Sequence, residues 1–261
     1  MRALDIGATG MLAQQRNVDV ISNNIANMNT TAFKKQKANF QDLIYQDLRR
    51  VGTNSSDAGT IVPTGIQLGS GVKLASVYRV LEQGDVNETG KETDILINGR
   101  GYFQIELPDG RTGYTRDGSF EISSDSVLVT HDGYPLQPSI QIPAGKESIT
   151  INQNGEVLVK VAGQVTPVNA GTINTANFAN ENGLESIGQN LFVETESSGA
   201  PQVGTPGSDG FGGLLARRLE TSNVNVVSEI TDLIRAQRAY EMNSKIIETA
   251  DQMSTTTSRL R

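Results

Sequence analysis

The sequence of 261 residues predicts an α+β protein in which N- and C-terminal α-helices pair as a coiled coil around an inserted antiparallel β-rich domain. Apolar residues recur at heptad spacing near both termini, and the middle of the chain alternates apolar and polar residues between turn signals. We expect an N-terminal helix within residues 1–31, an extended connector over 32–70, the β-rich domain over 71–219 and a C-terminal helix over 220–261.

The N-terminal helix carries one apolar stripe, whose members recur every seven residues with a second row three positions further on. The stripe consists of Leu4, Met11, Val18, Ile21, Ile25 and Met28. Gly7 and Gly10 interrupt the helix, and each costs about 1 kcal/mol relative to alanine in a helix interior. Because such a helix is marginal in water, we expect its stripe to be buried on the C-terminal helix and on further copies of both.

The C-terminal helix repeats the heptad pattern and contains neither glycine nor proline. We expect it to begin at Thr221, Ser222 and Asn223, whose side chains can cap a helix. Its apolar residues are Val226, Ile230, Leu233, Ala239, Ile246, Met253 and Leu260. Two sequence-distant helices around an inserted β-domain suit a subunit that polymerises through its termini, so we interpret both stripes as a polymer interface.

The middle of the chain reads as short strands. Residues 72–80 and 156–161 alternate apolar and polar side chains, as half-buried strands do. The pairs Asp109-Gly110, Asp117-Gly118 and Asp132-Gly133 suit turns with positive φ. This spacing of strands and turns predicts an antiparallel sandwich or an irregular barrel.

Composition excludes several classes of site. The chain has no cysteine, a net charge of −7 and no apolar run of the ~20 residues that a membrane span needs. Its first residues also lack the continuous apolar stretch of a cleaved signal peptide. Lys34, Lys35 and Lys37 form a small basic cluster without aromatic neighbours or a wider basic face, which favours solvated or intersubunit ion-pair roles over nucleic-acid binding.

No catalytic, cofactor or metal site is expected. His131, the single histidine, lies in a predicted turn, and the acidic residues of the middle that precede glycine are explained by turn chemistry. No nucleophile elbow, P-loop or dinucleotide fingerprint occurs. A hydrolase acting on the cell wall needs only two carboxylates, so it remains an alternative, as does a secreted β-rich binding module.

Six stretches of the chain contain motifs, at residues 22–34, 101–103, 114–120, 189–192, 220–227 and 233–245. These motifs resemble those of the flagellar axial family of rod, hook and hook-associated proteins. The terminal motifs are the most specific, and together with the shorter ones they extend the resemblance over essentially the whole chain.

Within that family the opening of the chain, its length and the stretch from Tyr45 to Pro63 are most similar to distal rod subunits. That stretch is associated in the family with a straight, stiff rod. The resemblance implies a structural subunit that self-assembles through its terminal helices into the rigid distal rod and transmits torque to the hook. Proximal rod and hook-type subunits remain alternatives.

The resemblance also implies partners and a location. Expected partners are other copies of the chain, proximal rod and hook subunits at the two ends of the polymer, the bushing rings of the outer membrane and peptidoglycan, the rod cap, and the flagellar type III export apparatus. The rod lies in the periplasm, and its subunits are exported without a cleaved signal peptide.

Polar motif residues flank the stripes. Asparagine bonds readily to nearby backbone, so we interpret Asn27 to Thr31 as the exit of the first helix, with Phe33 packing back onto the helix pair. The motif residues are Asn23, Asn24, Asn27, Asn29, Thr30, Phe33, Lys34, Asn223, Asn225, Gln237, Arg238, Tyr240, Asn243 and Ser244.

Overall fold

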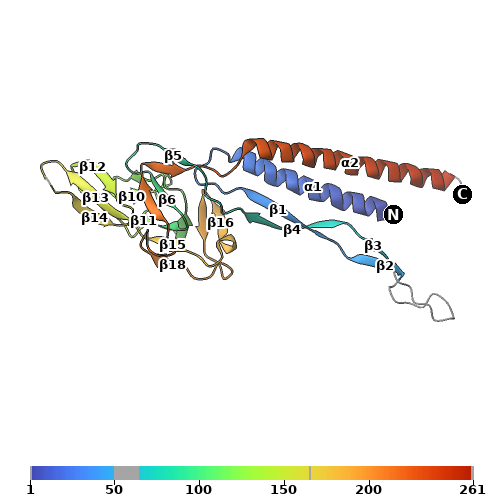
Figure 1. Ribbon diagram of the computed structural model, residues 1–261, viewed down its shortest axis with the longest axis horizontal. Helices are drawn as coiled ribbons and strands as arrows, with labels where there is room; N and C mark the ends of the chain where they lie inside the picture. The colour runs from blue at the N-terminus through green and yellow to red at the C-terminus, as the bar shows by residue number, and fades with distance from the viewer. Residues whose placement is uncertain (1, 50–64, 165, 260–261) are drawn as a thin grey trace. The chain divides into compact units, whose positions relative to one another are not determined.

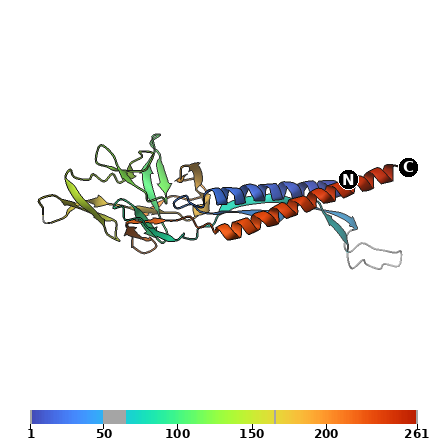
Figure 2. The ribbon, with the colours of Figure 1, turned by 90° about the horizontal axis from the view of Figure 1, so that it is seen from above.

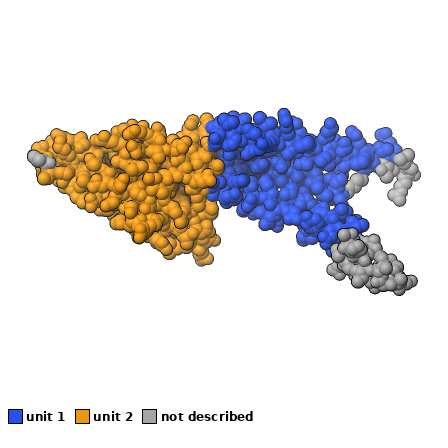
Figure 3. All heavy atoms as spheres, viewed as in Figure 1, with its two compact units in different colours: residues 1–26, 36–80, 225–261 blue, residues 27–35, 81–224 orange. Residues whose placement is uncertain are grey.

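The structure, a computed structural model, describes residues 2–49, 65–164 and 166–259. The chain divides into two compact units (Figure 3). Unit 1 comprises residues 1–26, 36–80 and 225–261, and unit 2 comprises residues 27–35 and 81–224. This division differs from the four expected segments, because residues 36–80 belong with the two terminal helices.

Unit 1 contains two long helices and two antiparallel strand pairs (Figures 1 and 2). Helix α1 (Arg2–Ala26) packs along α2 (Val226–Arg259). Strand β1 (Gln36–Asp42) pairs with β4 (Val72–Arg79), and β2 (Tyr45–Arg49) pairs with β3 (Ile66–Gly69). Because α1 also contacts β1 and β4, it is the central element of this unit.

Strands β1, β2 and β3 occupy residues that the sequence predicts to be an extended connector. Most residues of β1 are exposed, and its register with β4 shifts between Asn39 and Phe40. Both features weaken the apolar alternation by which a strand is recognised. The pairing is therefore absent from the sequence pattern, although the extended backbone was expected.

Small residues form the contact between α1 and α2. Gly7 is buried in α1, and Ala236 and Ala250 are buried in α2. A Cβ added at Gly7 would lie 2.8 Å from Cγ1 of Ile247, and one added at Gly10 would lie 2.9 Å from Nδ2 of Asn243. The two glycines thus allow the helices to approach closely. The sequence analysis considered only the unfavourable helix propensity of these glycines and not this packing role.

The predicted start of the C-terminal helix at residues 221–223 is wrong. Helix α2 begins at Val226, where the side-chain Oδ1 of Asn225 accepts a hydrogen bond from the Ser228 N–H at 3.2 Å. The Asn225 carbonyl accepts the first helical bond from Glu229 at 3.0 Å. Residues 221–223 belong to unit 2, where the Thr221 N–H bonds to the carbonyl of Asp85 at 2.9 Å.

Unit 2 consists of short strands and one 3-10 turn, η1 (Glu181–Gly183). Its strands are β5 (Val86–Glu88), β6 (Ile95–Asn98), β7 (Tyr102–Glu106), β8 (Thr112–Thr115), β9 (Glu121–Ile122), β10 (Leu128–Val129), β11 (Leu136–Gln137), β12 (Lys146–Ile151), β13 (Glu156–Val161), β14 (Val168–Thr172), β15 (Thr175–Asn177), β16 (Glu185–Gly188), β17 (Leu191–Val193), β18 (Gln202–Gly204), β19 (Gly213–Ala216) and β20 (Arg218–Glu220).

All strand pairs in the described part of unit 2 are antiparallel. A seven-stranded sheet has the order β16-β17-β8-β7-β15-β18, with β11 also beside β7, and β12-β13-β14 form a smaller sheet. Two further pairs, β5 with β20 and β6 with β19, join the first and last strands of the unit. These described strands form no closed barrel, so the barrel alternative is not found.

Two apolar clusters fill unit 2. In the larger one the rings of Phe103 and Phe120 meet edge to face at 5.1 Å, and both are fully buried. In the smaller one Tyr102 and Tyr114 surround Phe178. These side chains come from strands and turns far apart in the sequence, so their burial fixes the packing of the unit.

The predicted Asx-Gly turns divide into two kinds. Gly110 and Gly133 have φ of 79° and 85°, the left-handed backbone that such turns require. Gly118 serves a different purpose, because a Cβ there would lie 1.6 Å from the carbonyl oxygen of Ile95. At Gly118 the absence of a side chain makes room for neighbouring backbone.

We expect Gly7→Ala and Gly10→Ala to have different effects on the stability of unit 1. Both gain about 1 kcal/mol of helix propensity. The new methyl group at position 7 meets the branch of Ile247, whereas at position 10 it meets the movable end of Asn243. Thermal unfolding followed by far-UV circular dichroism should show a lower midpoint for G7A and an unchanged or higher one for G10A. Equal gains in both variants would contradict a tight contact at Gly7.

Candidate functional site

The outer face of α2 exposes large apolar side chains. Ile246 and Met253, both members of the predicted stripe, keep 49% and 64% of their surfaces exposed within the chain. Ile230, Ile234 and Met242 of the same helix are exposed as well. Several large apolar side chains left exposed on one helix are typical of an interaction surface. We call the exposed residues Val227, Ile230, Ile234, Met242, Ile246 and Met253 the outer apolar face.

The other predicted stripe residues are distributed between the interior and the surface. Ile21 is buried in unit 1, and Met28 is exposed in unit 2. Half-buried members are Leu4, Met11, Val18, Ile25, Val226, Leu233 and Ala239. Leu260 lies outside the described residues. The sequence analysis missed four exposed apolar residues, Ile6 and Leu12 on α1 and Ile234 and Met242 on α2. A search for apolar residues three or four positions from the stripe would have found Ile234 and Met242.

A groove of about 390 Å³ lies in unit 1. It is lined by Gln15 and Val18 of α1 and by Gln237, Tyr240 and Glu241 of α2. Two of the predicted motif residues, Gln237 and Tyr240, thus lie with the stripe residue Val18. Arg238 is exposed next to them, and Asn243 and Ser244 are half-buried.

Asn24 joins three elements of unit 1. Its Nδ2 donates to the carbonyl of Gln36 at 2.8 Å and to Oε2 of Glu229 at 3.1 Å. Its Oδ1 accepts the N–H of Gln36 at 2.8 Å. Asn24 is almost fully buried, and Glu229 is buried as well. The side chain therefore connects α1 to the start of β1 and to the first turn of α2, which the sequence interpretation as a helix-exit residue did not predict.

Glu220 organises a second buried cluster, in unit 2. Its Oε1 accepts hydrogen bonds from Nζ of Lys34 and from the N–H of Gly84, the latter at 3.0 Å. Its Oε2 accepts from Nε of Arg116 at 2.8 Å. The side chains of Lys34 and Arg116 are each 7% exposed. The predicted solvated or intersubunit role of Lys34 is therefore wrong, because its partner is a buried carboxylate within the same chain.

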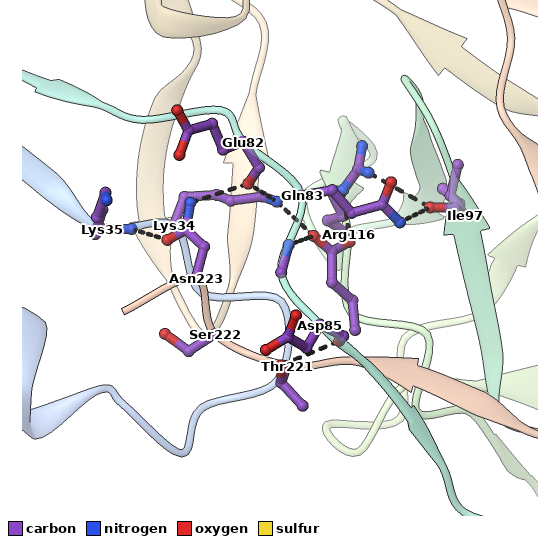
Figure 4. A network of polar contacts seen from close by, with 12 residues as sticks. Lys34, Lys35, Glu82, Gln83, Asp85, Ile97, Arg116, Thr221, Ser222 and Asn223 are labelled. Atoms are coloured by element: carbon purple, nitrogen blue, oxygen red, sulfur yellow. Dashed lines mark hydrogen bonds and ion pairs between the residues drawn. The ribbon is translucent and has the colours of Figure 1, made fainter. Parts of the chain in front are cut away.

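Hydrogen bonds around Glu220 hold three chain segments together. Lys34 Nζ and Asn223 Nδ2 both donate to the carbonyl of Glu82, at 2.8 and 2.9 Å (Figure 4). Asn223 Oδ1 accepts the N–H of Lys35 at 2.7 Å. The guanidinium of Arg116 also donates to the carbonyls of Ile97, Gly99 and Gly101. Residues 32–35, 82–85 and 220–223 thus form one polar cluster.

Burial and charge act against each other in this cluster. Burial raises the pKa of Glu220, but the nearby charges of Arg116 and Lys34 outweigh it and hold that pKa below its ordinary value. Burial lowers the pKa of Lys34, the charge of Glu220 opposes this, and Arg116 adds to the lowering. The ionised carboxylate is thus strongly favoured in the folded unit.

The remaining motif residues lie in turns or at the surface. Asn27 and Thr30 form the turn after α1. The Thr30 N–H donates a hydrogen bond to the Asn27 carbonyl, and the Thr30 hydroxyl donates one to Asn27 Oδ1, both at 3.1 Å. Asn23 and Asn29 are exposed and Phe33 is half-buried. Tyr45 is exposed in β2, and Pro63 lies outside the described residues.

His131 lies exposed in a turn, with its Nδ1 3.3 Å from Oε1 of Glu121. Among the described residues no group of three or more histidine or acidic side chains is arranged to hold a metal ion. Neither helix in that part of the chain is long and apolar enough to cross a membrane.

Three segments of the chain match known families. Residues 4–34 match the flagella basal body rod protein family, residues 96–159 the flagellar hook protein FlgE/F/G D1 domain, and residues 216–260 the flagellar basal body rod FlgEFG protein C-terminal family. The segments thus include both terminal helices and part of the β-rich unit.

Full-length relatives extend this similarity. The flagellar basal-body rod protein FlgG of Caulobacter vibrioides is 57% identical, with 100% of both chains covered. The FlgG proteins of Agrobacterium fabrum and Bacillus subtilis are 49% and 38% identical, with 99% and 97% of this chain and 99% and 96% of theirs covered. The chain therefore belongs to the flagellar basal-body rod family. Within it, the chain groups with the distal rod protein FlgG.

We expect Asn24→Ala to destabilise unit 1. The change leaves the backbone groups of Gln36 and the carboxylate of Glu229 without this partner, at about 1–3 kcal/mol for each buried polar group left unpaired. Thermal unfolding followed by far-UV circular dichroism measures the loss, with Ser22→Ala at an exposed position of the same helix as the control. Equal midpoints for N24A and S22A would show that the bonds contribute little.

We expect acid to destabilise unit 2 through Glu220. The pKa of Glu220 is lower in the folded unit than its ordinary value of 4.5. The ionised carboxylate therefore contributes its full stabilisation at pH values above 4.5, and this contribution is lost as the pH falls through the folded pKa. Urea midpoints between about pH 3 and pH 7, read from the near-UV signal of the buried tyrosines, should depend less on pH in Glu220→Gln. Glu185→Gln, at an exposed position, is the control. An unchanged acid dependence in E220Q would assign it to other groups.

Proposed function

We propose that the chain polymerises through the outer apolar face of α2 and the exposed apolar residues of α1 to build the rigid distal rod of the flagellar basal body. Membership of the rod family makes it a structural subunit of that body. The carrying observation is that large apolar residues of α2 remain uncovered within the chain, although they belong to a helix that packs along α1. Polymerisation would bury them.

In the polymer we expect α1 and α2 to wind as a coiled coil in the inner core. The heptad spacing of both stripes and the packing of the two helices support this arrangement. Helices α1 and α2 would supply this core, and the β-rich residues of unit 2 would form the outer domain. Tyr45 and the exposed ribbon of β2 and β3 would add contacts that stiffen the polymer.

The rod would transmit torque through the periplasm to the hook. Its partners would be proximal rod and hook subunits at its ends, the bushing rings and the rod cap, with delivery by the type III export apparatus and no cleaved signal peptide. We assign the chain no catalytic role. High identity to FlgG proteins over the whole chain favours the distal rod over the proximal rod, the hook, a secreted module or a wall hydrolase.

We expect Ile246→Glu and Met253→Glu to prevent polymerisation without unfolding the subunit. Each change places a carboxylate on the exposed outer apolar face, where assembly would have to bury it. Sedimentation and electron microscopy of concentrated protein measure polymer formation, and circular dichroism checks the fold. Gln252→Glu adds the same charge at an exposed polar position and should still polymerise. Filaments of parental length in I246E and M253E would contradict the proposed interface.

A further inference from the structure

Each unit contains a buried carboxylate that comes from near the end of the chain. Glu220 contacts Lys34 and Arg116 in unit 2, and Glu229 contacts Asn24 in unit 1. The Asn24–Glu229 pair spans 205 residues and the Lys34–Glu220 pair 186. Contacts between residues so far apart in the sequence form only after almost the whole chain is available.

Backbone pairing around Glu220 has the same long range. Strand β19 pairs with β6, and β20 pairs with β5. The Ala32 N–H donates to the Glu220 carbonyl at 2.8 Å, and the Asn223 N–H donates to the Phe33 carbonyl at 3.3 Å. Residues 213–223 therefore contribute backbone bonds to both the earliest segment and the first strands of unit 2.

The cluster cannot remain buried without this segment. Lys34 and Arg116 would then be two neighbouring cations in a buried site. Among the described residues, the carboxylate that forms a salt bridge with each of them is Glu220, and it would be missing. A buried charge without its partner is strongly unfavourable, and here the two cations would also repel each other. The electrostatics thus oppose closure of unit 2 until Glu220 arrives.

We propose that residues 213–229 are a closing strap, and that neither unit completes its folding until this segment has docked. A chain delivered N-terminus first then stays open until Glu220 and Glu229 are in place. A role of this strap in export, where a chain that folded too early could not pass through the export channel, rests on the proposed function. The folding behaviour itself is a property of the isolated subunit.

Hydrogen exchange on the full-length chain tests the strap in place. We expect Glu220→Gln to raise amide exchange in β5, β6 and residues 32–35 at least about tenfold. Gly84→Ala should do the same without a change of charge, because its Cβ would lie 1.9 Å from the Thr221 carbonyl oxygen. Glu229→Gln should act on α1 and β1. Glu185→Gln in unit 2 and Ser22→Ala in unit 1, both at exposed positions, are the controls. Parental exchange in β5 and β6 of both E220Q and G84A would overturn the proposal.

A double variant separates charge from packing. Lys34→Met removes one of the two cations that Glu220 neutralises. If closure is electrostatic, Lys34→Met combined with Glu220→Gln should exchange more slowly in β5 and β6 than E220Q alone. Faster exchange, with the two effects adding, would remove the electrostatic part of the proposal.

Cleavage of the folded chain tests the order of closure. A protease site at exposed Asp209, before β19, allows the folded protein to be cut and its two pieces to be separated in denaturant. We expect the cut protein to keep its fold. The separated N-terminal piece should show no cooperative unfolding, and adding the C-terminal piece should restore it. Cooperative unfolding of the N-terminal piece alone would overturn the proposal, whereas loss of polymerisation in I246E or M253E bears only on the proposed function.

Discussion

Burial of the Glu220 carboxylate between Lys34 and Arg116 is the interaction on which unit 2 most depends. Ionised groups leave water at a cost of several kcal/mol each, and only close opposite charges and complete hydrogen bonding offset it. Both oxygens of Glu220 are bonded, and the cations use backbone carbonyls as further acceptors. Removing one partner from such a site typically costs about 3–5 kcal/mol, which is comparable with the stability of a whole domain.

Unit 1 depends on apolar packing, because its two helices pair with each other and still leave apolar side chains exposed. Glycine and alanine at the contact let α1 and α2 approach closely with little side-chain volume. The larger residues Ile246 and Met253 are then left at the surface. If Ile246 and Met253 filled the contact between the helices, less apolar surface would remain exposed. The small-residue contact and the exposed stripe are thus two consequences of one arrangement.

The sequence predicted both helices, the β-rich middle and the family, because heptad spacing, strand alternation and terminal motifs are local patterns. It did not predict which face of α2 meets α1, since a period gives the spacing of a stripe and not its direction. The C-terminal stripe was interpreted as a polymer interface as a whole, yet within the chain Ile246 and Met253 are exposed while Leu233 and Ala239 are half-buried. Lys34 was misassigned for a related reason, because a short basic cluster resembles a solvated surface when its partner lies 186 residues away.

Asn24 shows how the same limit applies to the site. Asparagine near a helix end often bonds to nearby backbone, and this local rule led us to group Asn24 with the polar motif residues that flank the stripe. In the fold it lies in the last turn of α1, where its amide meets the backbone of β1 and the carboxylate of Glu229. The residues near a helix end give no information about a hydrogen-bond partner that lies 205 residues away in the sequence. Long-range polar contacts such as those of Glu220 and Glu229 therefore fix the arrangement within each unit, while local patterns fix the elements that they connect.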